Sequence, residues 1–450
     1  MRARQFHSLS CNTEAVARRV ARWPDATEQD AGQERRGRAR RPARRHRRRD
    51  DIVVGKIFIL LPPKDIGRCR VVRKSWRSAT STPGFMVEHR RRQPSLPIID
   101  GNGRPASFVT LRAAVAGRAT NQQIWPFPSQ YPIPMGSGLC LRASSDGFLI
   151  VWWMFRDRFY ICNPTTRKHA LLPLPGSSCV HGLYEHKSTG EYRVLWSSDD
   201  KRKQEATLYV LTVGAKESRS IQVVLPTLPS PSQKQMYQLI YHLRCKLFRK
   251  PPPVHHCGSL HWIFGPNLTL GGSSTEGIIV FDTEAESFRW MINPPIGDLM
   301  YKRLFDMEGT LAFVGTKSYN TAKDVWVMQD YEAETWAFKY RIDVSMIQAS
   351  RPLESTSPKE IRKRKRPLDS TVRSLGWMTP LNEHELLVGF NDNYVLRCDT
   401  DGKFLGVVTI GKRQYCMNLT GHRLQESIMT IPSGEMQGED EELPFSMQHV

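Results

Sequence analysis

The stretch IIVFDTEAESF at residues 278–288 places four apolar residues before a polar turn and then returns to an aromatic residue. A short apolar run bounded by Asp, Thr and Ser is typical of a β-strand, and a polar turn of this length can join two antiparallel strands. The same outline recurs as FYICNPTTR at 159–167, VWVMQDYEAETW at 325–336 and YVLRCDTDGKF at 394–404. Each of the four stretches therefore predicts a β-hairpin.

A second kind of strand lies between these hairpins and follows a turn that contains Gly or Asn. Its four examples lie at residues 146–150, 257–262, 308–313 and 382–387. The two kinds alternate with a unit of about 45 to 50 residues, which predicts an irregular β-propeller of roughly six blades. Because the repeat is weak, a β-sandwich stays open as the alternative. Four tryptophans are expected in the blade core rather than in a target pocket, namely Trp152, Trp153, Trp290 and Trp326.

The composition suits a folded chain with a basic N-terminal end. Of 450 residues, 40% are apolar and 9% aromatic, which is enough for one small module and one large β-domain. The formal charge is +21, and residues 1–50 contribute +9 of it, with 15 Arg and 6 acidic residues. Such charge could bind nucleic acid by neutralising phosphate, but a charge run is more often a solvated tail, so we do not expect nucleic acid as a partner. The alternative, nuclear nucleic-acid binding, would use this leader and Arg362–Arg366.

The Arg-rich leader itself cannot build a core. Residues 34–49 read ERRGRARRPARRHRRR and carry no apolar periodicity, so residues 1–49 are expected to be disordered. A nuclear-import or acidic-surface patch and an organellar presequence are the alternative interpretations.

Cysteine usage and hydropathy indicate an intracellular chain. The nine cysteines form no CxxC pair and no regular framework, so we expect reduced thiols. No stretch approaches the roughly 18 to 20 apolar residues of a membrane span, and no secretory signal begins the chain. We therefore expect the nucleus or cytoplasm, with no membrane partner and no cofactor.

The sequence offers little support for an enzyme. Zinc-ligand residue types gather near one strand, but their spacing fits no standard metal site: His255, His256, Cys257 and His261. No nucleophile elbow and no phosphate loop accompanies them. We therefore expect these residues to be structural, with no metal site and no catalytic residues.

A compact helical region precedes the β-pattern. Residues 52–61 are dense in apolar side chains and end at Pro62-Pro63, which predicts a first helix. Asp65 is expected to cap a second helix over residues 65–78, with one apolar face formed by Ile66, Cys69, Val72 and Trp76. The sequence Thr82-Pro83-Gly84 is expected to end it.

This helical region resembles the F-box core of plant F-box proteins. The match is carried by Leu61-Pro62-Pro63-Lys64 and by Lys74-Ser75-Trp76-Arg77. The β-rich remainder is similar to the F-box-associated, propeller-like domains of the same family, notably at residues 162–167 and 172–175. Together the two matches cover about residues 51–415.

The resemblance implies an α+β multidomain chain, with a short three-helix F-box followed by a large all-β domain. It also implies the substrate-recognition subunit of an SCF-type cullin-RING ubiquitin ligase, a non-catalytic role. The F-box would dock the small adaptor subunit, and through it the cullin, while the β-domain binds an unknown protein target for ubiquitination and degradation. The expected adaptor contacts are Ile57, Leu61, Pro62, Lys64, Ile66, Val71, Lys74 and Trp76, of which Ile66 and Trp76 could equally belong to the core of the module.

One departure from the family pattern leaves a second reading open. Arg48-Arg49 stands where the family begins its first helix with Leu-Pro, so the F-box is N-terminally incomplete. The alternative is a β-scaffold interaction protein with a non-functional F-box and no ligase role. The expected divisions are a leader at 1–49, the F-box at 50–90, a linker at 91–106, the propeller-like domain at 107–415 and a flexible acidic tail at 416–450.

Overall fold

The computed structural model describes most of the chain between residues 53 and 432. The described ranges are 53–101, 107–112, 120–124, 139–176, 178–198, 207–221, 252–264, 277–295, 301–307, 309–316, 322–343, 375–390, 394–400, 403–408 and 417–432. The Arg-rich leader and the basic run at 362–366 lie outside them.

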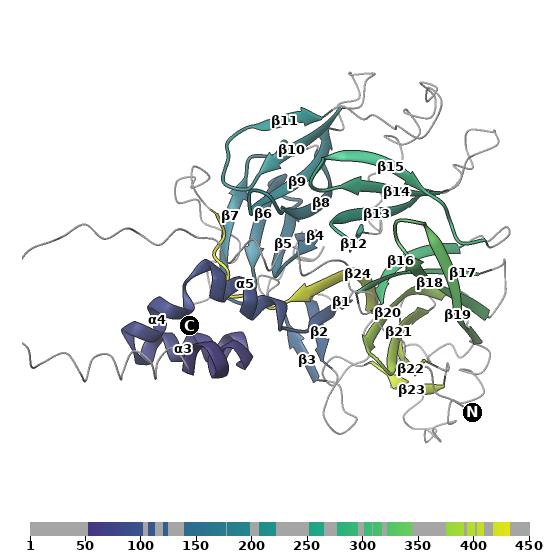
Figure 1. The fold of residues 1–450 in the computed structure, drawn as a ribbon, viewed down its shortest axis with the longest axis horizontal. Coiled ribbons are helices and arrows are strands. Elements are labelled where there is room, and N and C mark those ends of the chain that lie inside the picture. The colour runs from purple at the N-terminus through teal and green to yellow at the C-terminus, as the bar shows by residue number, and fades with distance from the viewer. Residues whose placement is uncertain are drawn as a thin grey trace, which may run out of the picture.

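Five short helices form a module at the start of the described chain (Figure 1). They are the π-helix η1 (Val53–Ile57), the 3-10 helix η2 (Phe58–Leu60) and the α-helices α3 (Pro63–Val72), α4 (Lys74–Thr80) and α5 (Pro83–Arg91). Proline suits the first position of α3 and α5, where its missing N–H has no helical partner to lose. Thr82 caps α5 by accepting a hydrogen bond from the backbone N–H of Phe85, at 3.4 Å.

The predicted second helix differs from the structure at both its start and its middle. Pro62, and not Asp65, is the N-cap residue, and Asp65 lies in the first turn of α3. Arg73 has extended backbone angles (φ −149°, ψ 131°) and divides the expected helix into α3 and α4. The break separates Trp76 from the helix that holds Ile66 and Cys69, because the helical period is not continuous across it, and Val72, the last residue of α3, is exposed.

Six four-stranded antiparallel sheets follow in the described part of the chain. Five are formed by consecutive strands: β4 (Leu139–Ser145), β5 (Phe148–Trp153), β6 (Arg158–Asn163) and β7 (Lys168–Leu172); β8 (Ser178–His186), β9 (Glu191–Ser198), β10 (Leu208–Thr212) and β11 (Ser218–Ile221); β12 (Val254–His256), β13 (Ser259–Phe264), β14 (Gly277–Asp282) and β15 (Ser287–Met291); β16 (Tyr301–Met307), β17 (Thr310–Thr316), β18 (Ala322–Asp330) and β19 (Thr335–Asp343); β20 (Leu375–Asn382), β21 (Glu385–Phe390), β22 (Tyr394–Asp399) and β23 (Phe404–Val407). The four predicted hairpins are confirmed as β6–β7, β14–β15, β18–β19 and β22–β23.

The sixth sheet joins the two ends of the described chain. Its strands are β24 (Met417–Gln425), β1 (Ser95–Gly101), β2 (Ser107–Arg112) and β3 (Thr120–Gln123), in that order. The pairs Ser95 with Gln425 and Gly101 with Met417 set the antiparallel register of β1 and β24. The innermost strand of this sheet therefore comes from the C-terminal part of the chain and closes a ring (Figure 1).

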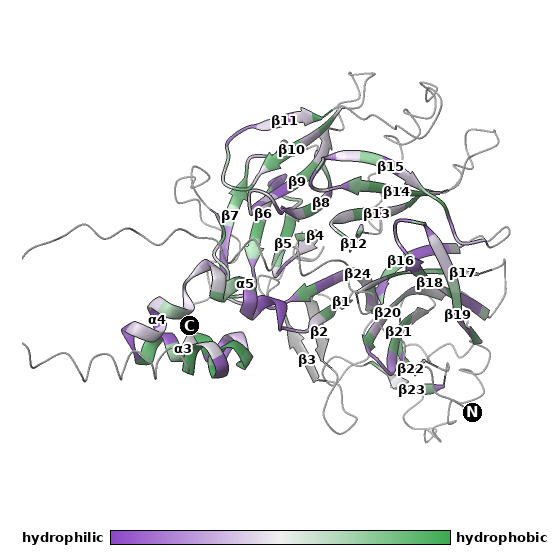
Figure 2. Ribbon diagram, in the orientation of Figure 1, coloured by the Kyte–Doolittle hydropathy of each residue, from purple (hydrophilic) through white to green (hydrophobic). Residues whose placement is uncertain are grey.

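Hydrophobic clusters between neighbouring sheets establish a propeller of six blades. Each of six buried clusters takes its residues from two adjacent sheets, and together the clusters run once around the ring. In β5, for example, Phe148 and Ile150 pack toward the β8–β11 sheet, while Leu149 and Val151 pack toward the β1–β3 sheet. Both faces of a blade are thus buried, which explains the continuous apolar runs seen along β5 and β14 in Figure 2. The propeller prediction is confirmed over the β-sandwich alternative.

A recurring turn connects the third and fourth strands of the blades. In three blades the last residue of the third strand is Asn163, Asp282 or Asp330, and its side-chain oxygen accepts hydrogen bonds from two following backbone N–H groups at 2.8 to 3.3 Å. The same turns end on a residue with positive φ, namely Arg167, Glu286 and Glu334. Short polar side chains that bond their own backbone favour such turns, which is why these stretches were recognisable.

The four tryptophans assigned to the blade core pack there as predicted. Each is partly buried and packs against one of the clusters between blades: Trp152, Trp153, Trp290 and Trp326.

Two of the predicted divisions of the chain are wrong. Residues 95–101 are not a linker, because they form β1, and Ile98 and Ile99 are fully buried. Residues 417–425 are not a flexible tail, because they form β24, the innermost strand of the closing blade. Both strands contain polar residues, and the partner that places each of them in the sheet lies more than 300 residues away in the sequence.

Candidate functional site

The helical module exposes several large apolar side chains. Val71 is 87% exposed, Val72 73%, Leu60 65% and Ile57 52%. Large apolar groups that remain in water within so small a module are typical of a protein-binding surface. We call these four residues the exposed apolar set: Ile57, Leu60, Val71 and Val72.

A compact core holds these side chains in place. Ile66 is fully buried among Val54, Phe58 and Met86, and the ring of Trp76 packs edge-on against Phe58 with centroids 4.9 Å apart. The buried His89 ring hydrogen-bonds to the Leu61 carbonyl oxygen at 2.8 Å, and burial lowers the pKa of His89. The module is therefore ordered without help from the exposed apolar set.

The structure separates the eight predicted contact residues into surface and core. Five of them are exposed, namely Ile57, Pro62, Lys64, Val71 and Lys74. Leu61 and Trp76 are partly buried and pack against the core of the module. Ile66 is wrongly assigned, because a side chain with 0% exposure cannot contact another protein without unfolding of the module. Ile66 therefore belongs to the core of the module.

Two exposed residues were not among the predicted contacts. Val72 was expected to be buried, but it is the last residue of α3, directly before the extended Arg73, and it is exposed. Leu60 lies in a single 3-10 turn that leaves it opposite the buried Phe58 and Ile59, and the sequence carries no signal for that turn. Backbone geometry between helices is poorly encoded in apolar periodicity.

A buried arginine joins the module to the propeller. Arg90 of α5 is 5% exposed, and its guanidinium lies 2.8 Å from an Asp146 carboxylate oxygen, 3.4 Å from Glu185 and 2.6 Å from the Tyr192 hydroxyl. Burial by itself would lower the pKa of Arg90, but Asp146, Tyr192 and Glu185 together raise it above its ordinary value. These partners lie in two different blades, so α5 is anchored across a blade boundary.

The residues after β24 make a second link, called the C-terminal strap (residues 426–432). Ile428 packs into the core of the helical module, and Met429 and Ile431 pack against the cluster between the β4–β7 and β8–β11 blades. The side-chain amide of Asn163 donates hydrogen bonds to the carbonyl oxygens of Ser427 and Met429, at 3.0 and 2.8 Å. The strap therefore fixes the module against the propeller.

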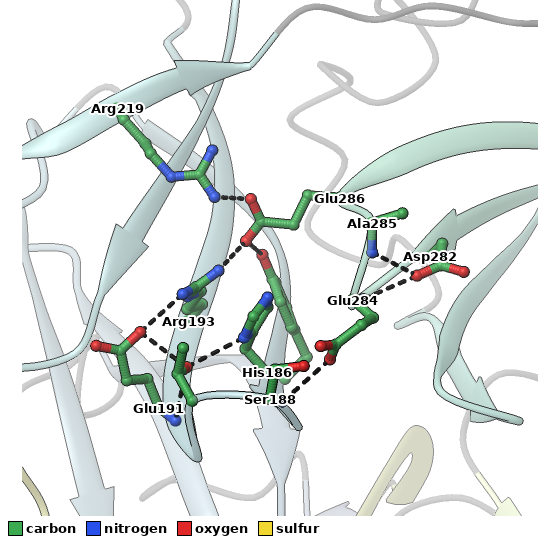
Figure 3. Close-up of polar contacts among 11 residues, drawn as sticks. His186, Ser188, Glu191, Arg193, Arg219, Asp282, Glu284, Ala285 and Glu286 are labelled. Atoms are coloured by element: carbon green, nitrogen blue, oxygen red, sulfur yellow. Dashed lines mark hydrogen bonds and ion pairs between the residues drawn. The ribbon is translucent and has the colours of Figure 1, made fainter.

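Polar turns on neighbouring blades are also tied together, as Figure 3 shows for the β8–β11 and β12–β15 sheets. Glu286 accepts hydrogen bonds from Arg193 at 2.7 Å and from the Tyr184 hydroxyl at 2.9 Å, and it pairs with Arg219. The backbone N–H of Ser188 donates to Glu284 at 3.2 Å. Since Glu286 is the positive-φ residue of the recurring turn, that turn also serves to join adjacent blades.

Innermost strands of five blades line a cavity of about 260 Å³ at the centre of the ring. Arg423 on its wall donates hydrogen bonds to Ser95, Thr379 and the Pro380 carbonyl oxygen, which ties β24 to its neighbours. Burial raises the pKa of the nearby Asp306 carboxyl, and Arg423 opposes that shift. Arg423 therefore helps to hold the ring closed.

Of the residues considered as metal ligands, His261 makes structural contacts in this fold. His261 donates from Nδ1 to the Val254 carbonyl oxygen at 3.1 Å, and its Nε2 lies 2.9 Å from the Tyr331 hydroxyl, an arrangement that suits a neutral imidazole. Within the described ranges there is no group of three or more His, Cys, Asp or Glu side chains that could hold a metal ion. Nor is any helix of the described chain long and apolar enough to cross a membrane.

Two buried histidines predict how stability depends on pH. Burial lowers the pKa of both His261 and His422 to about 3, whereas an unfolded chain protonates histidine near pH 6.5. As the pH falls below about 6.5, only the unfolded state takes up these protons, so stability is lost at about 1.4 kcal/mol per pH unit for each histidine. Urea unfolding between pH 6.5 and 5 should therefore show a steep decline.

The double variant His261→Asn/His422→Asn should be less stable at pH 7 and should show a flatter decline over that range. His384→Asn, which removes an exposed imidazole, is the matched control. An unchanged slope in the double variant would mean that other groups cause the acid sensitivity.

These features define a class of protein: a β-propeller protein that carries a small helical module with exposed apolar residues. The family model described as F-box associated beta propeller domain matches residues 121–353, which is more than half of the chain. The chain belongs to this family, and it is a plant F-box protein with a C-terminal F-box-associated domain.

The chain is also similar to individual known proteins, at low sequence identity. The Arabidopsis thaliana F-box protein At5g07610 is 22% identical over 331 residues, covering 67% of this chain and 72% of the relative. Among solved structures, a nidogen–laminin complex has 10% identity and a TM-score of 0.38, and covers 72% of this chain and 96% of its own. AztD of Citrobacter koseri has 9% identity and a TM-score of 0.34, with coverage of 71% and 84%.

Proposed function

We propose that this protein is the substrate-recognition subunit of an SCF-type ubiquitin ligase. Its helical module would dock the small adaptor subunit and, through it, the cullin, and its propeller would hold a protein target for ubiquitination and degradation. The role is non-catalytic and belongs inside the cell, in the nucleus or cytoplasm. The observation that carries the proposal is the exposed apolar set on an F-box module whose core is already complete without it.

The adaptor surface that we propose consists of apolar anchors with a basic rim. Ile57, Leu60, Val71 and Val72 would be buried on docking, and Lys64 and Lys74 are exposed in the same module. Buried apolar anchors supply most of the affinity of such an interface, whereas rim charges mainly speed association. Leu61, Pro62 and Trp76 would complete the contact where they remain accessible.

The rigid connection between module and propeller supports the same role. Arg90 and the C-terminal strap hold the F-box against two blades of the propeller. A receptor that presents a target to a distant enzyme requires such a fixed geometry, because positioning determines the effective concentration of the reacting groups. The target and the residues that bind it are not assigned.

Replacement of Val71 and Val72 by Glu should abolish adaptor binding without unfolding the protein. Both side chains are more than 70% exposed, so the fold loses little, whereas an interface would have to bury two charges. We expect the dissociation constant for the purified adaptor to rise at least thirtyfold, equivalent to about 2 kcal/mol. Isothermal titration calorimetry with the full chain measures it.

The matched control is Ile292→Glu, which changes a 73% exposed apolar residue on the propeller and should leave adaptor affinity unchanged. A further arm replaces Arg48-Arg49 by Leu-Pro, the family's usual start of the first helix. Binding by this restored chain alone would favour a non-functional F-box in the natural chain. No binding by either chain would overturn the proposal.

A further inference from the structure

The helical module carries a charge that its own carboxylates do not neutralise. Residues 53–92 contain 10 Lys and Arg but only two acidic residues, a net charge of +8. Of these basic residues, Arg90 is buried and paired with Asp146 and Glu185 of the propeller, so the others supply the surface charge. Both acidic residues are already paired, Asp65 with Arg68 at 2.8 Å and Glu88 with Arg92 at 2.8 Å. Lys64 is exposed on α3, which also exposes Val71 and Val72, and Lys74 and Arg77 are exposed on the following helix α4. The module thus combines basic and apolar surface, which fits an acidic segment with apolar anchors.

The chain itself contains a segment of that composition. Residues 433–450 read SGEMQGEDEELPFSMQHV and hold five acidic residues with no Lys or Arg, a net charge of −5. Four of the acidic residues are consecutive, Glu439 to Glu442, and Leu443-Pro444-Phe445 follows at once. We propose that this acidic C-terminal segment binds the basic and apolar surface of α3 and α4.

The C-terminal strap leads from the core of the module to the β8–β11 blade, where Pro432 lies against Gly214. Ile428 is part of the module core, and Pro432 lies only four residues further, which is at most about 14 Å of chain. The 18 residues from 433 to 450 can span up to about 60 Å, whereas the ten residues of α3 measure only about 15 Å. A segment tethered this closely has an effective concentration near the millimolar range at the module surface.

The consequence for the ligase rests on the proposed function, because the segment would cover the surface assigned to the adaptor. Exposed ion pairs are individually weak, but several of them on a short tether compete measurably with a partner in solution. The acidic segment therefore reduces adaptor binding by about three- to tenfold, and salt weakens the competition. Adaptor binding then depends on displacement of the segment.

The direct test does not involve the adaptor. A fluorescent peptide of residues 433–450 is titrated into the chain that ends at Pro432, at low and high salt. We expect binding that weakens with salt, and at least tenfold weaker binding by a peptide with Gln and Asn in place of its acidic residues. Lys64→Glu/Lys74→Glu should weaken binding of the acidic peptide, whereas the propeller control Lys168→Glu/Lys403→Glu should not. Equal binding of both peptides, or no effect of the module variant, would overturn the proposal.

A second measurement tests the consequence and separates the two proposals. Adaptor affinity is compared between the full chain and the chain that ends at Pro432, and the shorter chain should bind three- to tenfold more tightly. Equal affinity would overturn the competition. If neither chain binds the adaptor, the proposed ligase function fails, while the peptide titration still decides whether the acidic segment docks on the module.

Discussion

A chain that ends at residue 416 is expected not to form a closed propeller. It lacks β24, so β1 keeps only β2 as a partner and the closing blade loses its innermost strand. The truncation also removes buried Leu419 and Leu424 and the strap residue Ile428 from three different clusters. At about 2 kcal/mol or more for each buried side chain, the loss of these three groups alone is about 6 kcal/mol, comparable with the whole stability of a typical domain.

Truncation after Pro432 is the matched control for this experiment. It removes 18 residues but retains β24 and the strap, so the cooperative unfolding transition should survive with little change. Circular dichroism and urea unfolding distinguish the two chains. A cooperative transition of normal midpoint in the chain that ends at residue 416 would show that the ring does not depend on β24.

Replacement of Arg90 by Ala should destabilise the protein by about 3 to 5 kcal/mol, the cost typical of removing one partner from a buried ion pair. The Asp146 and Glu185 carboxylates would remain near the junction without their cation, and the Tyr192 hydroxyl would lose a donor 2.6 Å away. Urea unfolding of the full chain measures the change. We also expect faster proteolysis between module and propeller, because α5 loses its anchor to two blades.

Arg91→Ala provides the control, because the adjacent side chain is exposed and should change stability by no more than about 0.5 kcal/mol. Equal stabilities of the two variants would show that the buried arginine does not hold the module. A loss confined to Arg90→Ala would establish the junction as a stabilising interface.

Much of the propeller was predictable because its blades use local signals. The hairpins at Asp282 and Asp330 carry a short polar turn between two apolar runs, and both were found from sequence. The blade of β8–β11 lacked such a repeated stretch and was not singled out. For the helical module, apolar density located the core residue Phe58 and the resemblance located Val71, but the break at Arg73 was missed.

By itself, the sequence determined the family, the alternation of apolar runs and polar turns, and the basic character of the helical module. These properties depend on neighbouring residues in the chain, where strand and turn preferences act. Only the tertiary structure decided that β24 closes the ring, that Ile66 is buried while Val72 is exposed, and that Arg90 anchors the module. Each of these depends on groups brought together across the fold or on the angle between two short helices, and neither is encoded in local periodicity.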